Sequence, residues 1–87
     1  MAELFLPGTL MPLFPGLPRR LEVHAPTVGG AIDELEQQWP GLRDRLCEPG
    51  PELRPHIHVY VDRERATLQT PLEEPSRVDV VAAISGG

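Results

Sequence analysis

The 87-residue sequence predicts an α+β fold, with a mixed sheet of four to five strands and one main helix packed across one face. Several short runs alternate apolar and polar residues, which is typical of half-buried strands. Between them, one longer segment repeats its apolar residues at helical spacing. A hairpin, one helix and a closing strand share a core only if the helix lies across the sheet, and the last strand can then run parallel beside the first.

The first two strands are expected to form a hairpin. Residues 3–6 are β-prone and stop at a Pro-Gly pair, which commonly forms a turn. Residues 9–19 are apolar but contain three prolines, so a loop with at most a ragged strand edge is expected there. Residues 20–25 alternate, with Leu21 and Val23 on one face. The hairpin would therefore close around the proline-rich loop.

The helix is predicted to begin after Thr27, a suitable N-cap, and to end at the Pro-Gly pair at residues 40–41. Gly29 and Gly30 weaken its first turn, and we expect them to allow a close approach to the sheet. The apolar residues recur at spacings of four, three and four, as one stripe: Val28, Ile32, Leu35 and Trp39.

The second half of the chain is predicted to contain a short helical turn and three strands. Leu42 and Leu46 face inward from the turn. Strands are expected at residues 56–61, at residues 65–68 along an edge, and at residues 77–84. The inward positions of the two longer strands are Ile57, Val59, Val61, Val78 and Val80. This order of elements is that of the β-grasp fold, which ubiquitin also has.

Composition excludes several classes of function. The net charge of −5 disfavours a nucleic-acid partner, because binding to phosphates requires basic residues. No apolar run is long enough to span a membrane, and the first residues do not resemble a signal peptide, so we expect a cytoplasmic location. One cysteine excludes an internal disulfide. All eight basic residues are arginine, so the side chains offer no amine.

Candidate catalytic and metal-binding residues are few. His56 and His58 have a spacing that two metal ligands could use, but no third ligand is evident, so no metal is assigned. Cys47 is expected to be a small, partly buried apolar residue and not a nucleophile, because a chain this short has little room for a catalytic pocket. The glycines near residue 29 do not have the spacing of a phosphate-binding loop.

The sheet face opposite the helix is a candidate binding surface. If Leu4 and Leu6 point inward, then Phe5 points outward, and the same alternation places Tyr60 and Val81 outward. Three apolar side chains on neighbouring strands would form a patch suited to a partner enzyme.

The chain ends in Ile-Ser-Gly-Gly, directly after the last predicted strand. We therefore expect a domain over residues 1–84 and a flexible diglycine tail over residues 85–87, with Ile84 and Ser85 at its base as further partner contacts. Gly86 and Gly87 lack Cβ atoms and can pass through a narrow channel. A carboxylate on such an arm suits activation as a mixed anhydride with AMP in another protein's active site.

The sequence resembles the MoaD/ThiS family of sulfur carrier proteins over essentially its whole length. The segments that carry the resemblance are LFLPGTL, TVGGAIDELEQQWPGLRDRLCEPG, IHVYVDRER and the final ISGG. The run WPGLRDRLCEPG followed by HIHVYVDRE is most similar to the CysO-like branch, which delivers sulfur for cysteine synthesis. The resemblance implies that an adenylating enzyme of the MoeB/ThiF type activates Gly87 with ATP, and that a sulfur donor then converts it to a thiocarboxylate.

The resemblance leaves several roles open. The expected role is a protein co-substrate that binds no cofactor of its own and is not an enzyme. Its sulfur acceptor would be a cysteine-synthase-like enzyme, with a metalloprotease as a possible further partner. The alternatives are the small subunit of molybdopterin synthase, which would bind the large subunit, and a ubiquitin-like modifier joined to lysines of other proteins. A plain binding module with an incidental diglycine end is the remaining possibility.

Overall fold

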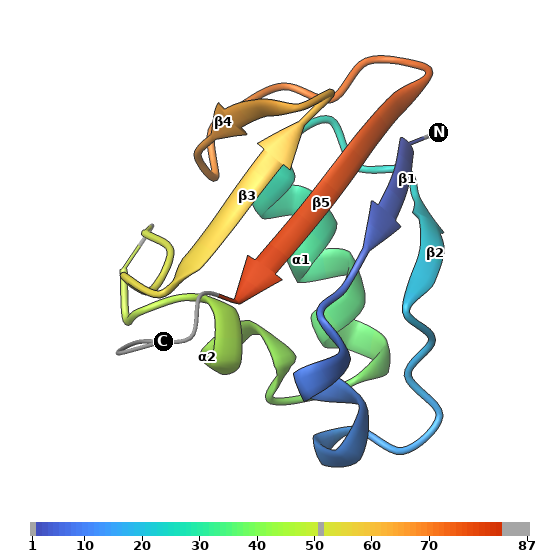
Figure 1. Cartoon of the computed structure of the whole chain (residues 1–87), viewed down its shortest axis with the longest axis vertical. Coiled ribbons are helices and arrows are strands. Elements are labelled where there is room, and N and C mark those ends of the chain that lie inside the picture. Colours follow the sequence, from blue (N-terminus) through green and yellow to red (C-terminus); the bar gives the residue numbers. More distant parts are fainter. Residues whose placement is uncertain (1, 51, 83–87) are drawn as a thin grey trace.

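The structure, a computed structural model, describes residues 2–50 and 52–82. These residues contain five strands and three helices, joined by loops (Figure 1). In chain order they are β1 (Ala2–Phe5), the 3-10 helix η1 (Gly8–Leu13), β2 (Arg20–Val23), α1 (Val28–Gln38), α2 (Leu42–Leu46), β3 (Ile57–Val61), β4 (Glu64–Ala66) and β5 (Ser76–Ala82).

The five strands form one mixed sheet in the order β2-β1-β5-β3-β4. The first and last strands, β1 and β5, are parallel neighbours, and every other pairing is antiparallel. Helix α1 lies across one face of this sheet (Figure 1). The predicted α+β, β-grasp fold is therefore confirmed, including the parallel pairing of the two terminal strands.

One predicted loop differs from the structure, and one predicted boundary lies outside the described residues. The proline-rich loop contains η1, a 3-10 helix with Pro12 inside it. Its flanking bonds run from the N–H of Leu10 to the oxygen of Pro7 and from the N–H of Phe14 to the oxygen of Met11, so the helical bonding is present on both sides of Pro12, whose nitrogen cannot donate. The last strand is described as far as Ala82. The predicted end of the domain and the tail lie outside the described residues.

The helix begins where the sequence predicts. The hydroxyl oxygen of Thr27 accepts a hydrogen bond of 3.1 Å from the N–H of Gly30 and caps the first turn. The expected reason for the two glycines is only partly right, because they approach loops and not a strand. A Cβ on Gly29 would lie 3.1 Å from the oxygen of Leu68, and one on Gly30 would lie 2.9 Å from the Cβ of Ala25.

The core lies between α1, α2 and the inner face of the sheet. Cys47 belongs to it with 2% of its surface exposed, and burial raises the pKa of its thiol, which disfavours the nucleophilic thiolate. The largest fully buried side chains are Leu4, Val23, Val28, Ile32, Leu35, Leu42, Leu46, Val59 and Val78. Within residues 2–50 and 52–82, no helix has the length and apolar character needed to cross a membrane.

Candidate functional site

The sheet face opposite α1 carries the side chains that alternate with the core residues, and we call it the outer face. Strand register places these side chains in rows across the sheet. The central row contains, in order, Arg20, Phe5, Asp79, Tyr60 and Arg65. The other members of the outer face are Glu3, Glu22, His58, Arg77 and Val81.

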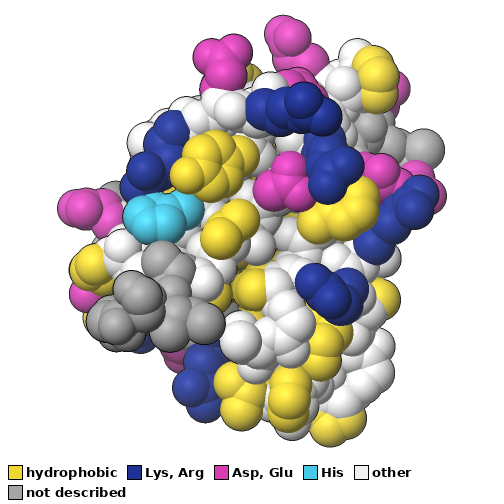
Figure 2. Space-filling view, in the orientation of Figure 1, with side chains coloured by type: hydrophobic (Ala, Val, Ile, Leu, Met, Phe, Trp, Pro, Cys, Tyr) yellow, Lys and Arg dark blue, Asp and Glu magenta, His cyan; other side chains and the backbone are white. Residues whose placement is uncertain are grey.

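The three predicted apolar contact residues share the outer face but do not form one continuous apolar patch. Asp79 lies between Phe5 and Tyr60 in the central row. Val81 lies two residues further along β5, opposite His58. Figure 2, which looks onto this face, shows apolar, basic and acidic side chains interleaved across it. The face is therefore of mixed character.

Phe5 is covered by cations. The guanidinium carbon of Arg77 lies 4.2 Å from the centroid of the Phe5 ring, and that of Arg20 lies 5.9 Å from it. Each arginine is held by a carboxylate. Arg77 Nε is 3.0 Å from Asp79 Oδ2, and Arg20 Nε is 2.6 Å from Glu3 Oε2. The hydrogen bond with Asp79 also raises the pKa of Arg77. A partner that contacts the Phe5 ring would therefore also contact the ion pairs around it.

Val81 is the most exposed apolar side chain of the outer face, with 43% of its surface accessible. Its neighbour His58 is half-buried, and the His58 Nδ1 atom is buried without a hydrogen-bond partner in the described part of the chain. Val81 is therefore more accessible to a partner than the rings of Phe5, His58 and Tyr60, which are half-buried.

The remaining predicted contact residues, Ile84 and Ser85, lie outside the described residues, as do Gly86 and Gly87. The last described residue of β5 is Ala82, which pairs with Ile57 at the end of the sheet. The roles assigned to these four residues therefore stay predictions.

No three potential metal ligands come together within residues 2–50 and 52–82. His56 lies just before β3, whereas His58 lies within it on the outer face. Cys47 is in the core on the other side of the sheet. The assignment of no metal is a prediction that rests on the sequence.

The arginine–carboxylate frame of Phe5 was not part of the sequence prediction. Alternation along the last strand could have placed Arg77 and Asp79 on the same face as Val81. Contact with Phe5 depends on which strands are neighbours and in which register, and alternation within one strand does not contain that information.

The sequence profile of the ThiS family matches residues 12–87. A relative among characterised proteins, small archaeal modifier protein 3 of Haloferax volcanii, is 32% identical over 65 residues, which is 70% of either chain.

Solved structures agree with this match. CysO in the Amycolatopsis orientalis BexX/CysO complex superposes with a TM-score of 0.85 and 24% identity over 100% of both chains. Mycobacterium tuberculosis CysO gives a TM-score of 0.84 and 24% identity over 97% of this chain and 100% of that one. SAMP1 of Haloferax volcanii gives 0.75 and 29% identity over 99% of this chain and 98% of that one. The chain therefore belongs to the ThiS family of ubiquitin-like, β-grasp sulfur carriers and small protein modifiers.

Proposed function

We propose that this protein is a sulfur carrier whose reactive group is the carboxylate of Gly87. The observation that carries the proposal is the match to the ThiS family, which extends through the final Ser-Gly-Gly. The described fold supports it, because the compact sheet would serve as the handle by which partner enzymes hold a short reactive arm.

The chemistry takes two steps. A carboxylate oxygen of Gly87 attacks the α-phosphorus of ATP in the partner's active site, and pyrophosphate leaves. Hydrosulfide or an equivalent sulfur nucleophile then attacks the carbonyl carbon of the acyl adenylate. The bond from that carbon to the AMP oxygen breaks, and a thiocarboxylate and AMP are formed. Its sulfur is a stronger nucleophile than a carboxylate oxygen, which suits transfer to an acceptor.

The outer face would be the docking surface for these partners. Val81 supplies an exposed apolar contact, and Phe5 with its arginines supplies a mixed one. Tyr60 lies in the same row as Phe5. Proposed partners are an adenylating enzyme of the MoeB/ThiF type and an acceptor of the cysteine-synthase type. A precedent for binding another protein is the BexX/CysO complex, whose CysO has the same fold.

The first test is the intact mass of the protein. We expect incubation with ATP, hydrosulfide and a MoeB/ThiF-type activating enzyme to replace one oxygen by sulfur. Gly86→Val should abolish this change, because a branched side chain would not pass through a channel that admits glycine. Gly8→Val makes the same substitution at an exposed position in η1, so it is the matched control and should react as the unchanged protein does. An unaltered mass under conditions that convert a known carrier would contradict the proposal.

A second candidate function is that of a protein modifier, and the 32% identity to small archaeal modifier protein 3 favours it. In that role, the activated Gly87 would form an isopeptide bond with lysines of other proteins. This chain contains no lysine, so it could not form lysine-linked chains with itself. Isopeptide-linked adducts in cell extracts, detected after trypsin digestion as residues 78–87 attached to lysine, would establish the role, and their absence from extracts of expressing cells would exclude it.

A further inference from the structure

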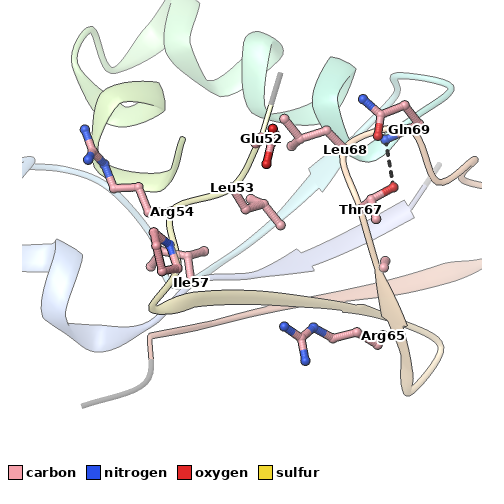
Figure 3. A pocket seen from close by; sticks show the side chains of 10 residues that line it. Glu52, Leu53, Arg54, Ile57, Arg65, Thr67, Leu68 and Gln69 are labelled. Carbon is pink, nitrogen blue, oxygen red and sulfur yellow. Dashed lines mark hydrogen bonds between the residues drawn. The ribbon is translucent and has the colours of Figure 1, made fainter. Parts of the chain in front are cut away.

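We propose that the open edge of β4 binds an extended, basic segment of a partner protein by strand addition. A cavity of about 390 Å³ adjoins this edge (Figure 3). We call it the edge cavity, and its lining residues are 52–55, Ile57 and 65–69. It lies on the helix side of the sheet, so it is separate from the outer face and does not depend on the sulfur chemistry proposed above.

The backbone of β4 has unused hydrogen-bonding groups. β4 is the last strand in the sheet order, so one of its sides is unpaired within the described residues. Val61 and Glu64 pair across a two-residue turn and exchange hydrogen bonds, so the bonded positions in β4 are Glu64 and Ala66. The backbone N–H and C=O of Arg65, between them, therefore point toward the open edge.

The hydrogen bonds between β3 and β5 support this assignment of the bonded positions in β4. The N–H of Asp62 donates to the oxygen of Arg77 over 2.8 Å. Two residues earlier in the chain, Tyr60 pairs with Asp79, and this pair is therefore also a hydrogen-bonded one. The backbone groups of Tyr60 are therefore directed toward β5, and they leave those of Arg65 without a partner in β3.

A second backbone edge faces the cavity from residues 52–54. Leu53 forms an isolated bridge with Cys47. The flanking hydrogen bonds are Glu48 N–H to Glu52 oxygen, 3.0 Å, and Arg54 N–H to Leu46 oxygen, 2.9 Å. In this antiparallel pattern, the N–H and C=O of Leu53 point away from Cys47. Leu53 lines the cavity and Cys47 does not, so these groups face the cavity.

The occupant best matched to this arrangement is a polypeptide strand. Unpaired donors and acceptors on an edge recruit another backbone, and a strand presents both kinds of group along its length. Half of the lining residues are apolar, and their side chains would receive every second side chain of the added strand. These apolar residues are Leu53, Pro55, Ile57, Ala66 and Leu68.

One exposed carboxylate at the rim favours a basic residue in the occupant. The two arginines of the lining are directed elsewhere, because Arg54 Nε donates to the oxygen of Asp44 over 2.7 Å and the Arg65 side chain points away from the cavity (Figure 3). Glu52 is exposed at the rim, and its carboxylate makes no hydrogen bond or ion pair within residues 2–50 and 52–82. A lysine or arginine of the partner would pair with it.

A site here would let one partner hold the protein while another uses the outer face and the tail. The two surfaces lie on opposite sides of the sheet, so binding at one leaves the other accessible. Strand addition at β4 would therefore be a second contact, and its absence would leave the proposed sulfur chemistry unaffected.

The test is a titration of the full ¹⁵N-labelled chain with the acetylated, amidated pentapeptide Lys-Val-Thr-Val-Lys. We expect saturable amide shifts confined to residues 52–54, 57 and 65–69. A second peptide has the same side chains but methyl groups on the two valine nitrogens, which removes the donors along one edge. It should bind at least tenfold more weakly.

Two variants at one position test the backbone directly. Arg65→Pro removes the N–H at the open edge, a position where proline is tolerated in strands, and should weaken binding at least tenfold. Arg65→Ala is the matched control, since it keeps the N–H and alters only a side chain on the outer face. Equal binding of both peptides, no saturable binding, or shifts centred on Phe5 and Val81 would each overturn the proposal. The peptide pair does so even if Arg65→Pro fails to fold.

Discussion

At the scale of single residues, Phe5 and Val81 present two different kinds of apolar contact. The Phe5 ring lies beneath Arg77 and Arg20, which are in turn held by Asp79 and Glu3. A partner that meets Phe5 therefore also meets guanidinium groups whose positions are set. Val81 has no such cover and is 43% exposed. We infer that Val81 is where docking gains the most from removing apolar surface from water.

Val81→Asp is expected to slow adenylation by the activating enzyme at least tenfold. A carboxylate at the centre of a dry interface loses its hydration without gaining a partner. The loss in free energy of unfolding should be about 1 kcal/mol, which is the range of strand propensities, because the side chain is on the outer face. Rates of ATP-dependent pyrophosphate exchange and urea unfolding curves measure the two effects.

Arg63→Asp is the control for this experiment. It places a carboxylate in the exposed turn between β3 and β4 and changes the net charge by more than Val81→Asp does. An equal loss of rate in both variants would mean that overall charge, and not contact at Val81, governs docking.

At the scale of elements, α2 depends on a contact from α1. Five residues are too few for a helix to be stable alone, so its first turn needs outside partners. The carboxylate of Glu36 accepts hydrogen bonds from the N–H groups of Gly41 and Arg43, at distances from 2.8 to 3.2 Å. The left-handed backbone of Gly41, with φ of 99°, brings these groups to the carboxylate.

We expect Glu36→Gln to lower the free energy of unfolding at neutral pH. The hydrogen bonds from Gly41 and then Arg43 lower the pKa of Glu36 below its ordinary value. A lowered pKa means that the stabilisation is complete above the unfolded-state pKa, about 4.3, and is lost as pH falls through the folded-state value. The difference between the two proteins should therefore shrink in acid. Urea unfolding at several pH values measures it.

Glu64→Gln removes an exposed carboxylate in β4 and is the control. Its difference from the unchanged protein should vary little over the same pH range. A Glu36→Gln difference that is constant from neutral pH into acid would contradict the proposed role of the ionised carboxylate.

The elements that could be predicted are those whose signals are local. Alternation located β3 and β5, and helical spacing with Thr27 located α1. The 3-10 helix η1 could not be predicted, because proline usually ends helices and only the bonding pattern around Pro12 explains its presence. The cover over Phe5 and the edge cavity could not be predicted either. Both depend on which segments become neighbours, and that is decided by packing of the whole chain.

At the scale of the whole molecule, charge is distributed unevenly. Three arginines and three carboxylates balance on the outer face, so the net charge of −5 is carried by the rest of the surface. Docking through the outer face therefore does not require a strongly basic partner surface at the contact itself. The remaining negative charge would act over longer distances, in orienting the protein toward basic regions of a partner.

Addition of sulfur at Gly87 is tested most directly on one peptide. Arg77 is the last basic residue and the chain has no lysine, so trypsin releases residues 78–87 as one fragment. This fragment contains neither cysteine nor methionine, so any sulfur in it has been added. After reaction with ATP, labelled hydrosulfide and the activating enzyme, we predict labelled sulfur in this fragment, located on Gly87 by its fragment ions. Label found only in the peptide that contains Cys47, or no label at all, would contradict the account.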